Sequence, residues 1–172
     1  MVELKPMTKA DIDQCGTIHY EAFYSRFQNA LLEREPQAEQ DFRNSFDFIY
    51  YFSKYIEDSD KHAYCICHDG EVIGYIAALE LPTFGGDSII YIDSIAVSPK
   101  HQKHGYGRNA LKQFMELFPA SAVKRLLTDK KRPAFKMYES LGFMDMEMVV
   151  MEHSQLLTKM NNYIQSHKDD SE

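Results

Sequence analysis

The 172-residue chain has no long apolar run, only three cysteines, and fewer basic than acidic residues. No apolar segment approaches the ~20 residues needed to cross a bilayer, so we expect no membrane-spanning helix and no membrane partner. The opening Met-Val-Glu-Leu-Lys-Pro has no basic segment followed by an apolar one, so we expect no signal peptide. Three cysteines do not make a disulfide framework. We therefore expect reduced thiols and a cytoplasmic protein.

The charge balance argues against one class of partner. The chain has 26 Asp and Glu against 19 Lys and Arg, a formal net charge of -7. A general nucleic-acid binder carries a basic surplus, so we expect no nucleic-acid partner. A negative chain attracts cationic substrates at long range, although the same charge also serves solubility. The hydrophobic share of 44% excludes a disordered chain, and the length suits one domain with its own core.

Hydrophobic periodicity and turn residues predict helices interspersed among strands in one mixed α/β domain spanning residues 1–172. Thr8 and Asp11 are spaced as a capping box, Asp69-Gly70 is a tight hairpin signal, and Gly142 fits a helix C-terminus. We expect strands at residues 2–6, 62–68, 71–81, 88–97, 123–128 and 144–151. We expect helices after Thr8, at 42–56, 105–118 and 133–142, and at 154–165 before a frayed end.

A basic glycine loop follows the most apolar strand. The strand ends at Val97 and a helix begins near Gly105, so unpaired backbone N–H groups at the helix start would attract phosphate. Gly105 and Gly107 permit close approach, and Lys100, Lys103 and Arg108 add positive charge. The pattern predicts a site for a phosphate-bearing cofactor. The alternative is an ordinary strand-to-helix loop with solvated charges.

The same glycines also fit a dinucleotide fingerprint, Gly105-x-Gly107-x-x-Ala110, with Asp129 as the ribose-binding acid. Two features disfavour this interpretation. That fingerprint follows its strand within a residue or two, whereas seven residues lie between Val97 and Gly105. The chain after Asp129 is also too short for the remainder of a doubly wound domain.

Two motifs resemble the GNAT superfamily of N-acetyltransferases. The family signature [Gln/Arg]-x-x-Gly-x-[Gly/Ala] is matched by Gln102-Lys103-His104-Gly105-Tyr106-Gly107, preceded by Ile95-Ala96-Val97-Ser98-Pro99. A second family element is an alanine four residues before a tyrosine that is followed by Leu-Gly-Phe, as in Ala134, Tyr138 and Leu141-Gly142-Phe143. The resemblance implies a GNAT-like acyl-CoA N-acyltransferase fold, whose central mixed sheet is mostly antiparallel and flanked by helices.

The resemblance also implies a function, which is direct acetyl transfer from acetyl-CoA to a primary amine without a metal. The pyrophosphate of CoA would be held by the loop residues Gln102, Lys103, His104, Gly105, Tyr106, Gly107 and Arg108. The backbone of Ile95, Ala96 and Val97 would pair with the pantetheine arm and polarise the thioester carbonyl. Tyr138 would protonate the departing thiolate. An alternative of another class is a CoA-binding sensor or scaffold without turnover.

The family often has an asparagine seven residues before the tyrosine, where it contacts the cofactor. This chain has Lys131 there, whose basic side chain would meet a CoA phosphate instead. The family also usually adds another strand where this chain is predicted to end in a helix.

The general base is less clear from the sequence. Asp93 is the first candidate, because it lies on the central strand four residues before Val97. A buried carboxylate there would have a raised pKa and would accept the proton of the amine, directly or through water. The alternative is that Asp93 bonds a neighbouring backbone group or tyrosine structurally. Glu80 is a weaker candidate.

Two other clusters have competing interpretations. Cys65 and Cys67, with His62 and His68, could suggest metal, but period-two spacing puts both cysteines on one strand face, and we expect a core position and no metal. Half of the aromatic residues lie between residues 20 and 55. Helical spacing explains many of them as core, and the surplus would line an acceptor pocket or a homodimer contact.

Overall fold

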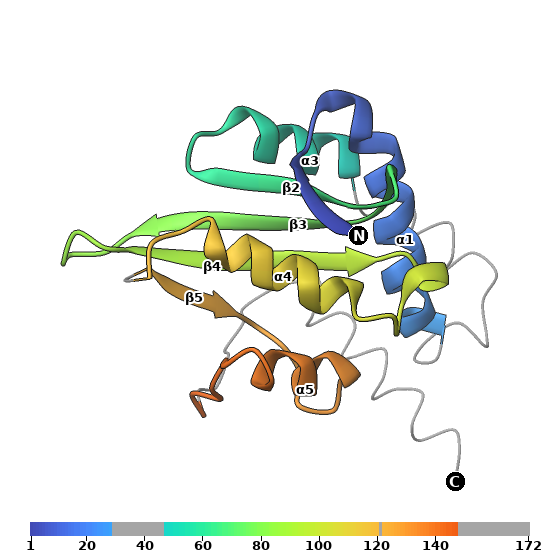
Figure 1. Cartoon of the computed structure of the whole chain (residues 1–172). Helices are drawn as coiled ribbons and strands as arrows, with labels where there is room; N and C mark the ends of the chain where they lie inside the picture. The colour runs from blue at the N-terminus through green and yellow to red at the C-terminus, as the bar shows by residue number, and fades with distance from the viewer. Residues whose placement is uncertain (29–46, 121, 148–172) are drawn as a thin grey trace, which may run out of the picture. The chain divides into compact units, whose positions relative to one another are not determined.

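The computed structural model describes residues 1–28, 47–120 and 122–147, which form five strands and four α-helices (Figure 1). The strands are β1 (Val2–Pro6), β2 (Lys61–His68), β3 (Glu71–Pro82), β4 (Ser88–Val97) and β5 (Val123–Leu126). The helices are α1 (Ile12–Gln28), α3 (Phe48–Glu57), α4 (Tyr106–Glu116) and α5 (Pro133–Glu139), with 3-10 turns at Lys9–Asp11 and Pro99–His101.

The five strands form one sheet in sequence order, β1-β2-β3-β4-β5. The first three pairings are antiparallel and the β4–β5 pairing is parallel. Helix α4 crosses one face, while α1 and α3 lie on the other (Figure 1). The prediction of a mostly antiparallel mixed sheet flanked by helices is confirmed.

Local sequence signals set several of these boundaries. Asp69 and Gly70 have φ of 51° and 86°, as a two-residue hairpin turn requires. The carboxylate of Asp11 accepts a hydrogen bond from the backbone N–H of Thr8 at 2.8 Å, so the predicted capping pair starts the first helical segment. Gly142 has φ of 88° and donates its N–H to Glu139 O, which stops α5 as predicted.

The sheet has a buried core on each face. On the α1 and α3 face, Cys15 and Phe52 pack with Cys65, Cys67 and other buried residues. Both strand cysteines are below 3% exposed, which confirms the predicted core position. Alternate strand positions, including Ile66, Ile76 and Ile90, are fully buried and serve the opposite face, where α4 contributes Leu111 and Phe114.

Helix α3 buries a different face from the one predicted. Helical spacing in the sequence puts Phe42, Phe46, Ile49, Tyr50, Ser53 and Ile56 on one side of this helix. The side chains of Ile49 and Tyr50 are nevertheless 57% and 64% exposed. Phe52 and Tyr55 are buried instead. The helix begins at Phe48, where the Asp47 carboxylate accepts a hydrogen bond from Tyr50 N. Phe42 and Phe46, also expected in this helix, lie outside the described residues.

The C-terminal predictions are only partly covered. The chain divides into two compact units, Met1–Gly142 and Phe143–Glu172. In the second unit, residues 143–147 are described and contain no strand, so the strand expected from Met144 does not begin there. Its remainder and the terminal helix lie outside the described residues. Strand β5 also ends at Leu126 rather than Thr128. In the described ranges, no helix is long and apolar enough to cross a membrane.

Gly74 allows β3 and β4 to approach closely. A Cβ atom at this position would lie 2.4 Å from the carbonyl oxygen of Ala96 and 3.2 Å from Val97 Cα. Both are backbone atoms of β4, so they cannot rotate away. The contact can be relieved only by moving one strand.

We therefore expect Gly74→Ala to destabilise the chain by about 1–3 kcal/mol, the usual cost of overpacking. Urea unfolding measures the change through the midpoint and slope. Gly85→Ala is the matched control, because its Cβ would meet only Thr83 Oγ1, at 3.9 Å. Equal stability of the two variants would contradict the close approach.

Candidate active site at the end of strand β4

Strand β4 parts from β5 halfway along its length. The parallel ladder joins Ile89–Ile92 to Val123–Leu126 and stops there. From Ser94 to Val97, β4 remains paired with β3. Among the residues that the structure describes, no strand pairs with the other edge of this second half. That edge offers backbone N–H and C=O groups to an extended ligand, which could add to the sheet as another strand would.

A β-bulge lies at the point where the strands part. Ala77 faces Ser94 and the next residue, Ala78, faces Ile92, so Asp93 is the extra residue. A bulge bends its strand and changes where side chains point. Asp93 and Ser94 are consecutive, yet both bond groups on the α1 and α3 side of the sheet. The bulge thus puts two adjacent polar side chains on one face.

The loop after β4 has the backbone geometry of an anion site. Lys103 and Gly105 have φ of 66° and 79°. Alternation of such left-handed residues with ordinary ones turns successive N–H groups toward one point. Helix α4 then begins, and its first internal hydrogen bond runs from Asn109 N to Gly105 O. Helix geometry leaves the N–H groups of the residues between, Tyr106 to Arg108, without intrahelical acceptors.

The space beside these amides is open. A Cβ at Gly105 would meet nothing within 4 Å, and one at Gly107 would meet only Val97 Cγ2, at 3.4 Å. Lys103, His104 and Arg108 are exposed around it. Neither glycine carries a side chain that would block an anion at this loop, and the basic side chains would add to its attraction.

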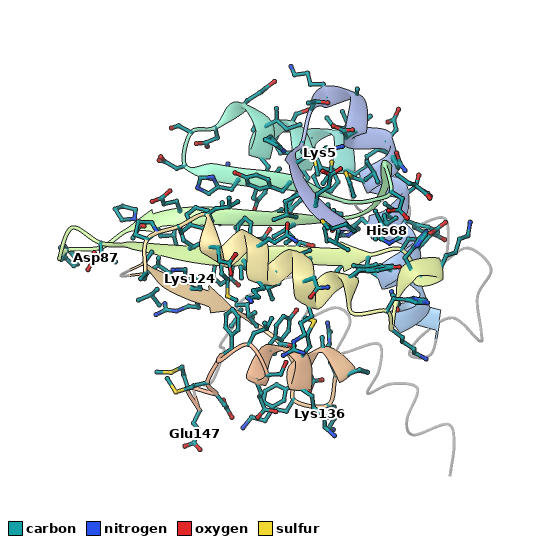
Figure 2. The ribbon with its side chains drawn as sticks, viewed as in Figure 1. Lys5, His68, Asp87, Lys124, Lys136 and Glu147 are labelled. Carbon is teal, nitrogen blue, oxygen red and sulfur yellow. The ribbon has the colours of Figure 1, made fainter. Side chains whose placement is uncertain are left out.

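Contacts of three loop side chains hold the loop in place. Gln102 Nε2 donates to the carbonyl of Val97 at 2.9 Å, tying the loop to the end of β4. His104 Nδ1 donates to the carbonyl of Gln102 at 2.8 Å. The ring of Tyr106 lies 4.5 Å from that of His68 on β2. Figure 2 shows His68 at this end of the sheet and Asp87 at the tip of the β3–β4 hairpin, at the opposite end.

Asp93 is exposed, so the expectation of a buried carboxylate is wrong. The bulge turns the side chain toward the edge of α3. Tyr51 Oη and Tyr55 Oη both donate to Asp93 Oδ2, at 2.5 Å and 2.8 Å. The tyrosine contact considered from the sequence is therefore present. Oδ1 of Asp93 receives no hydrogen bond from any described residue, and it can accept one from a ligand.

The two tyrosines are fixed as donors. Burial, followed by the hydrogen bond to the Asp93 carboxylate, raises the pKa of Tyr51 above its ordinary value. The same two causes raise the pKa of Tyr55. Both phenols therefore keep their protons across the physiological range. Together they hold Asp93 through two hydrogen bonds to Oδ2.

A second polar group next to Asp93 was not anticipated from the sequence. Ser94 Oγ lies 2.8 Å from Tyr75 Oη, and Tyr75 Oη lies 2.5 Å from His19 Nδ1. The three side chains come from β4, β3 and α1. No sequence motif connects them, because the contact depends on the position of the bulge.

Tyr138 and Lys131 belong to the segment around α5. Tyr138 is 9% exposed, and Arg108 Nη2 donates to the carbonyl of Ser140 at 3.5 Å. This bond joins the first turn of α4 to the end of α5. Lys131 is exposed in the preceding turn, where its N–H donates to Asp129 Oδ1. The hydrogen bonds of Asp93 go to tyrosines of α3 and not to this segment. The roles expected for Tyr138 and Lys131 therefore stay predictions.

Glu80 is occupied elsewhere. Its Oε2 lies 3.1 Å from His62 Nε2, and hydrogen bonds from Ser88 and His62 lower the pKa of Glu80. A lowered pKa makes Glu80 a poorer proton acceptor. The two cysteines Cys15 and Cys65 are a separate matter: their sulfur atoms lie 3.9 Å apart in the core. The contact with Cys15, followed by burial, raises the pKa of the Cys65 thiol. Neither thiol is placed as a nucleophile.

The sequence profile of the acetyltransferase (GNAT) family matches residues 20–143 of this chain. No curated protein matches this chain in a sequence comparison. The matched span includes α3, the whole of β2 to β5, the glycine loop and α5.

Solved structures agree in fold. An aminoglycoside acetyltransferase, HMB0005, from an uncultured soil metagenomic sample has a TM-score of 0.67 at 20% identity, covering 90% of this chain and 98% of its own. A transcriptional regulator from Bacillus halodurans C-125 has a TM-score of 0.65 at 19% identity, covering 90% and 100%. The aminoglycoside N-acetyltransferase AAC(6')-Iy, in complex with CoA, has a TM-score of 0.63 at 14% identity, and the match covers 90% of this chain and 95% of its own. The loop, the parted strands and the profile match lead to one conclusion: this chain belongs to the GNAT family of acetyltransferases.

Proposed function

We propose that the chain transfers an acetyl group from acetyl-CoA to a primary amine of a cationic small molecule or peptide. The observation that carries this proposal is the second half of β4. Within the sixteen residues from Asp93 to Arg108, an open backbone edge and an exposed carboxylate precede a loop with the backbone geometry of an anion site. Donor and acceptor would therefore meet along one strand.

The described residues fit the donor. The N–H groups from Lys103 to Arg108 would hold the pyrophosphate, and the Gln102 side chain ties the loop to the end of β4. Lys131 would meet another phosphate. The free edge from Ile95 to Val97 would pair with the amides of the pantetheine arm. Acetyl-CoA supplies an acetyl group activated as a thioester, and N–H groups of this edge would stabilise negative charge on the thioester oxygen.

Asp93 and Tyr138 would handle protons on the two sides of the reaction. A free alkyl ammonium has a pKa near ~10 and must lose a proton before attack. Oδ1 of Asp93 would accept it, directly or through water, while Tyr51 and Tyr55 hold Oδ2. Tyr138 would give its proton to the departing thiolate.

The acceptor class follows from charge. A carboxylate exposed in a chain of net charge -7 attracts ammonium groups. The half-buried ring of Tyr51, whose hydroxyl bonds Asp93, would provide apolar surface beside the carboxylate. Two of the similar structures are aminoglycoside acetyltransferases. Their low identity carries only the fold, so aminoglycosides enter as one class to be tested.

The first test measures release of free CoA thiol with a panel of polyamines, aminoglycosides, amino acids and peptides with free N-termini. We expect release with at least one cationic amine and a mass increase of one acetyl group on it. Tight acetyl-CoA binding without release for any amine would indicate a sensor instead. Failure to bind CoA would contradict both functions.

The second test separates the phosphate site from the stability of the fold. Gly105→Ala should weaken CoA binding ~10-fold or more by calorimetry, because a side chain with φ near 79° costs about 1–2 kcal/mol and occupies the open space. Gly86→Ala is the matched control, since its φ of 84° and its empty surroundings are the same but it lies at the β3–β4 hairpin tip. Equal CoA affinity of the two variants would contradict the loop site.

The third test concerns Tyr138. Tyr138→Phe keeps the ring and removes the hydroxyl, so kcat should fall ~100-fold, a typical contribution of a general acid, with CoA affinity nearly unchanged. Tyr50→Phe, on the exposed side of α3, serves as the control. An unchanged kcat in Tyr138→Phe would remove this residue as the acid.

A further inference from the structure

Acetylation of an ammonium group requires two protons to leave one nitrogen. The ammonium has three N–H bonds and the product amide has one. One proton ends on the CoA thiol and the other in solvent. The proposed function gives this nitrogen a single acceptor, Asp93, whose carboxylate takes one proton at a time. A second acceptor close to Asp93 would complete the balance.

Ser94, the residue after Asp93 on β4, is the candidate for this second acceptor. In a regular strand, neighbouring side chains point to opposite faces, but the bulge puts Ser94 on the same side as Asp93. Ser94 is half-buried and its Oγ lies 2.8 Å from Tyr75 Oη. A hydroxyl can accept one proton while donating another, so Ser94 needs a partner that receives its own proton.

Tyr75 and His19 continue the line away from β4. Tyr75 is fully buried, and its ring meets Phe52 edge to face at 4.9 Å. Its Oη lies 2.5 Å from Nδ1 of His19, whose half-buried ring also packs against Phe23 at 4.6 Å. Packing fixes the phenol between a hydroxyl and an imidazole. Histidine is the side chain whose unperturbed pKa suits reversible protonation near neutral pH.

Few other described titratable groups adjoin this line. From α3, Tyr51 and Tyr55 approach it through Asp93, the residue next to Ser94. From α1, Glu21 accepts a hydrogen bond from Ser98 Oγ at 3.3 Å, beyond the end of β4. These groups bond other residues, whereas Tyr75 Oη contacts both Ser94 Oγ and His19 Nδ1 and so connects them.

We propose that Ser94, Tyr75 and His19 form a proton relay that takes the second proton from the acceptor nitrogen. This inference rests on the proposed function. Ser94 Oγ accepts the proton from nitrogen and gives its own to Tyr75 Oη. Tyr75 gives its proton to His19 Nδ1, so the imidazole becomes imidazolium and later releases one proton to solvent. The proton taken by Asp93 returns through solvent to Tyr138, which has given its own proton to the thiolate, so both residues are restored. Ser94 touches the substrate, and the other two residues act through it.

The division between the two acceptors follows from charge. The carboxylate of Asp93 attracts the ammonium and takes the first proton, which turns the nitrogen into a nucleophile. Attack on the thioester makes the nitrogen positive again. The neutral relay then takes the second proton, because Asp93 has already been protonated.

One measurement needs no acceptor. The relay requires neutral His19 to carry its proton on Nε2, so that Nδ1 is free to accept. In ¹⁵N NMR spectra of the full chain near neutral pH, assigned by comparison with His19→Gln, Nδ1 of His19 should show the unprotonated shift. A protonated Nδ1 in neutral His19 would reverse the hydrogen bond and overturn the relay.

The kinetic measurement uses the panel amine with the highest kcat/KM. Ser94→Ala and Tyr75→Phe should each lower kcat at least 10-fold with little change in KM for acetyl-CoA. Ser94→Thr keeps a hydroxyl and should retain most of the kcat of the unaltered chain. A plot of kcat against the D₂O fraction of the solvent should be curved for the unaltered chain, because several protons move together, and straighter for Ser94→Ala. Tyr64→Phe, whose ring packs on Phe114 of α4, is the control.

The outcomes separate the two proposals. If the unaltered chain acetylates a panel amine and Ser94→Ala keeps both its kcat and its curvature, the relay is overturned and the proposed function stands. If the unaltered chain acetylates none of the amines, the proposed function fails, and the relay fails with it.

Discussion

The separation of β4 from β5 at Asp93 is the constraint on which the rest of the site depends. Up to Ile92 the strand is paired on both edges, and beyond the bulge it is held by β3 alone. Gly74 allows the close approach that keeps this second half against β3. Without the bulge, Asp93 and Ser94 would face opposite sides, and only one could serve the acceptor. Without the separation, the backbone edge would already be occupied.

The two sides of the site differ in how they are held. The loop from Gln102 to Arg108 is fixed by backbone conformation, with two left-handed residues and the start of α4, and it presents N–H groups to open space. The side that we propose for the acceptor is fixed by side chains from four elements, α1, α3, β3 and β4. Tyrosines of α3 hold Asp93, and Tyr75 connects Ser94 to His19. Conserving the loop while changing α1 and α3 would retain the proposed donor site and alter the proposed acceptor site, as expected where one fold serves many substrates.

The sequence predicted the parts of this arrangement that depend on local chemistry. Asp69-Gly70, the Thr8 and Asp11 pair and Gly142 each require a particular backbone or cap, and each is found as expected. The glycine loop and its strand were also found from their motif. Asp93 was identified but expected to be buried, and Ser94, Tyr75 and His19 were missed. Their contacts depend on a one-residue change of register between β3 and β4, which leaves no periodic signal in either strand. The prediction for α3 was wrong for Ile49 and Tyr50, which are exposed, because the buried side of a helix depends on the tertiary packing of Phe52 and Tyr55.

Hydrogen–deuterium exchange with and without CoA tests the central claim most directly. Backbone amides of Ile89–Ile92, paired on both edges of β4, should be protected in both states. Between Asp93 and Val97, the amides that point away from β3 should exchange rapidly in the free chain and become protected when CoA binds, together with those of Lys103 to Arg108. Protection at the loop without any at this edge of β4 would contradict the account, because the donor would then not lie along the strand that carries Asp93 and Ser94.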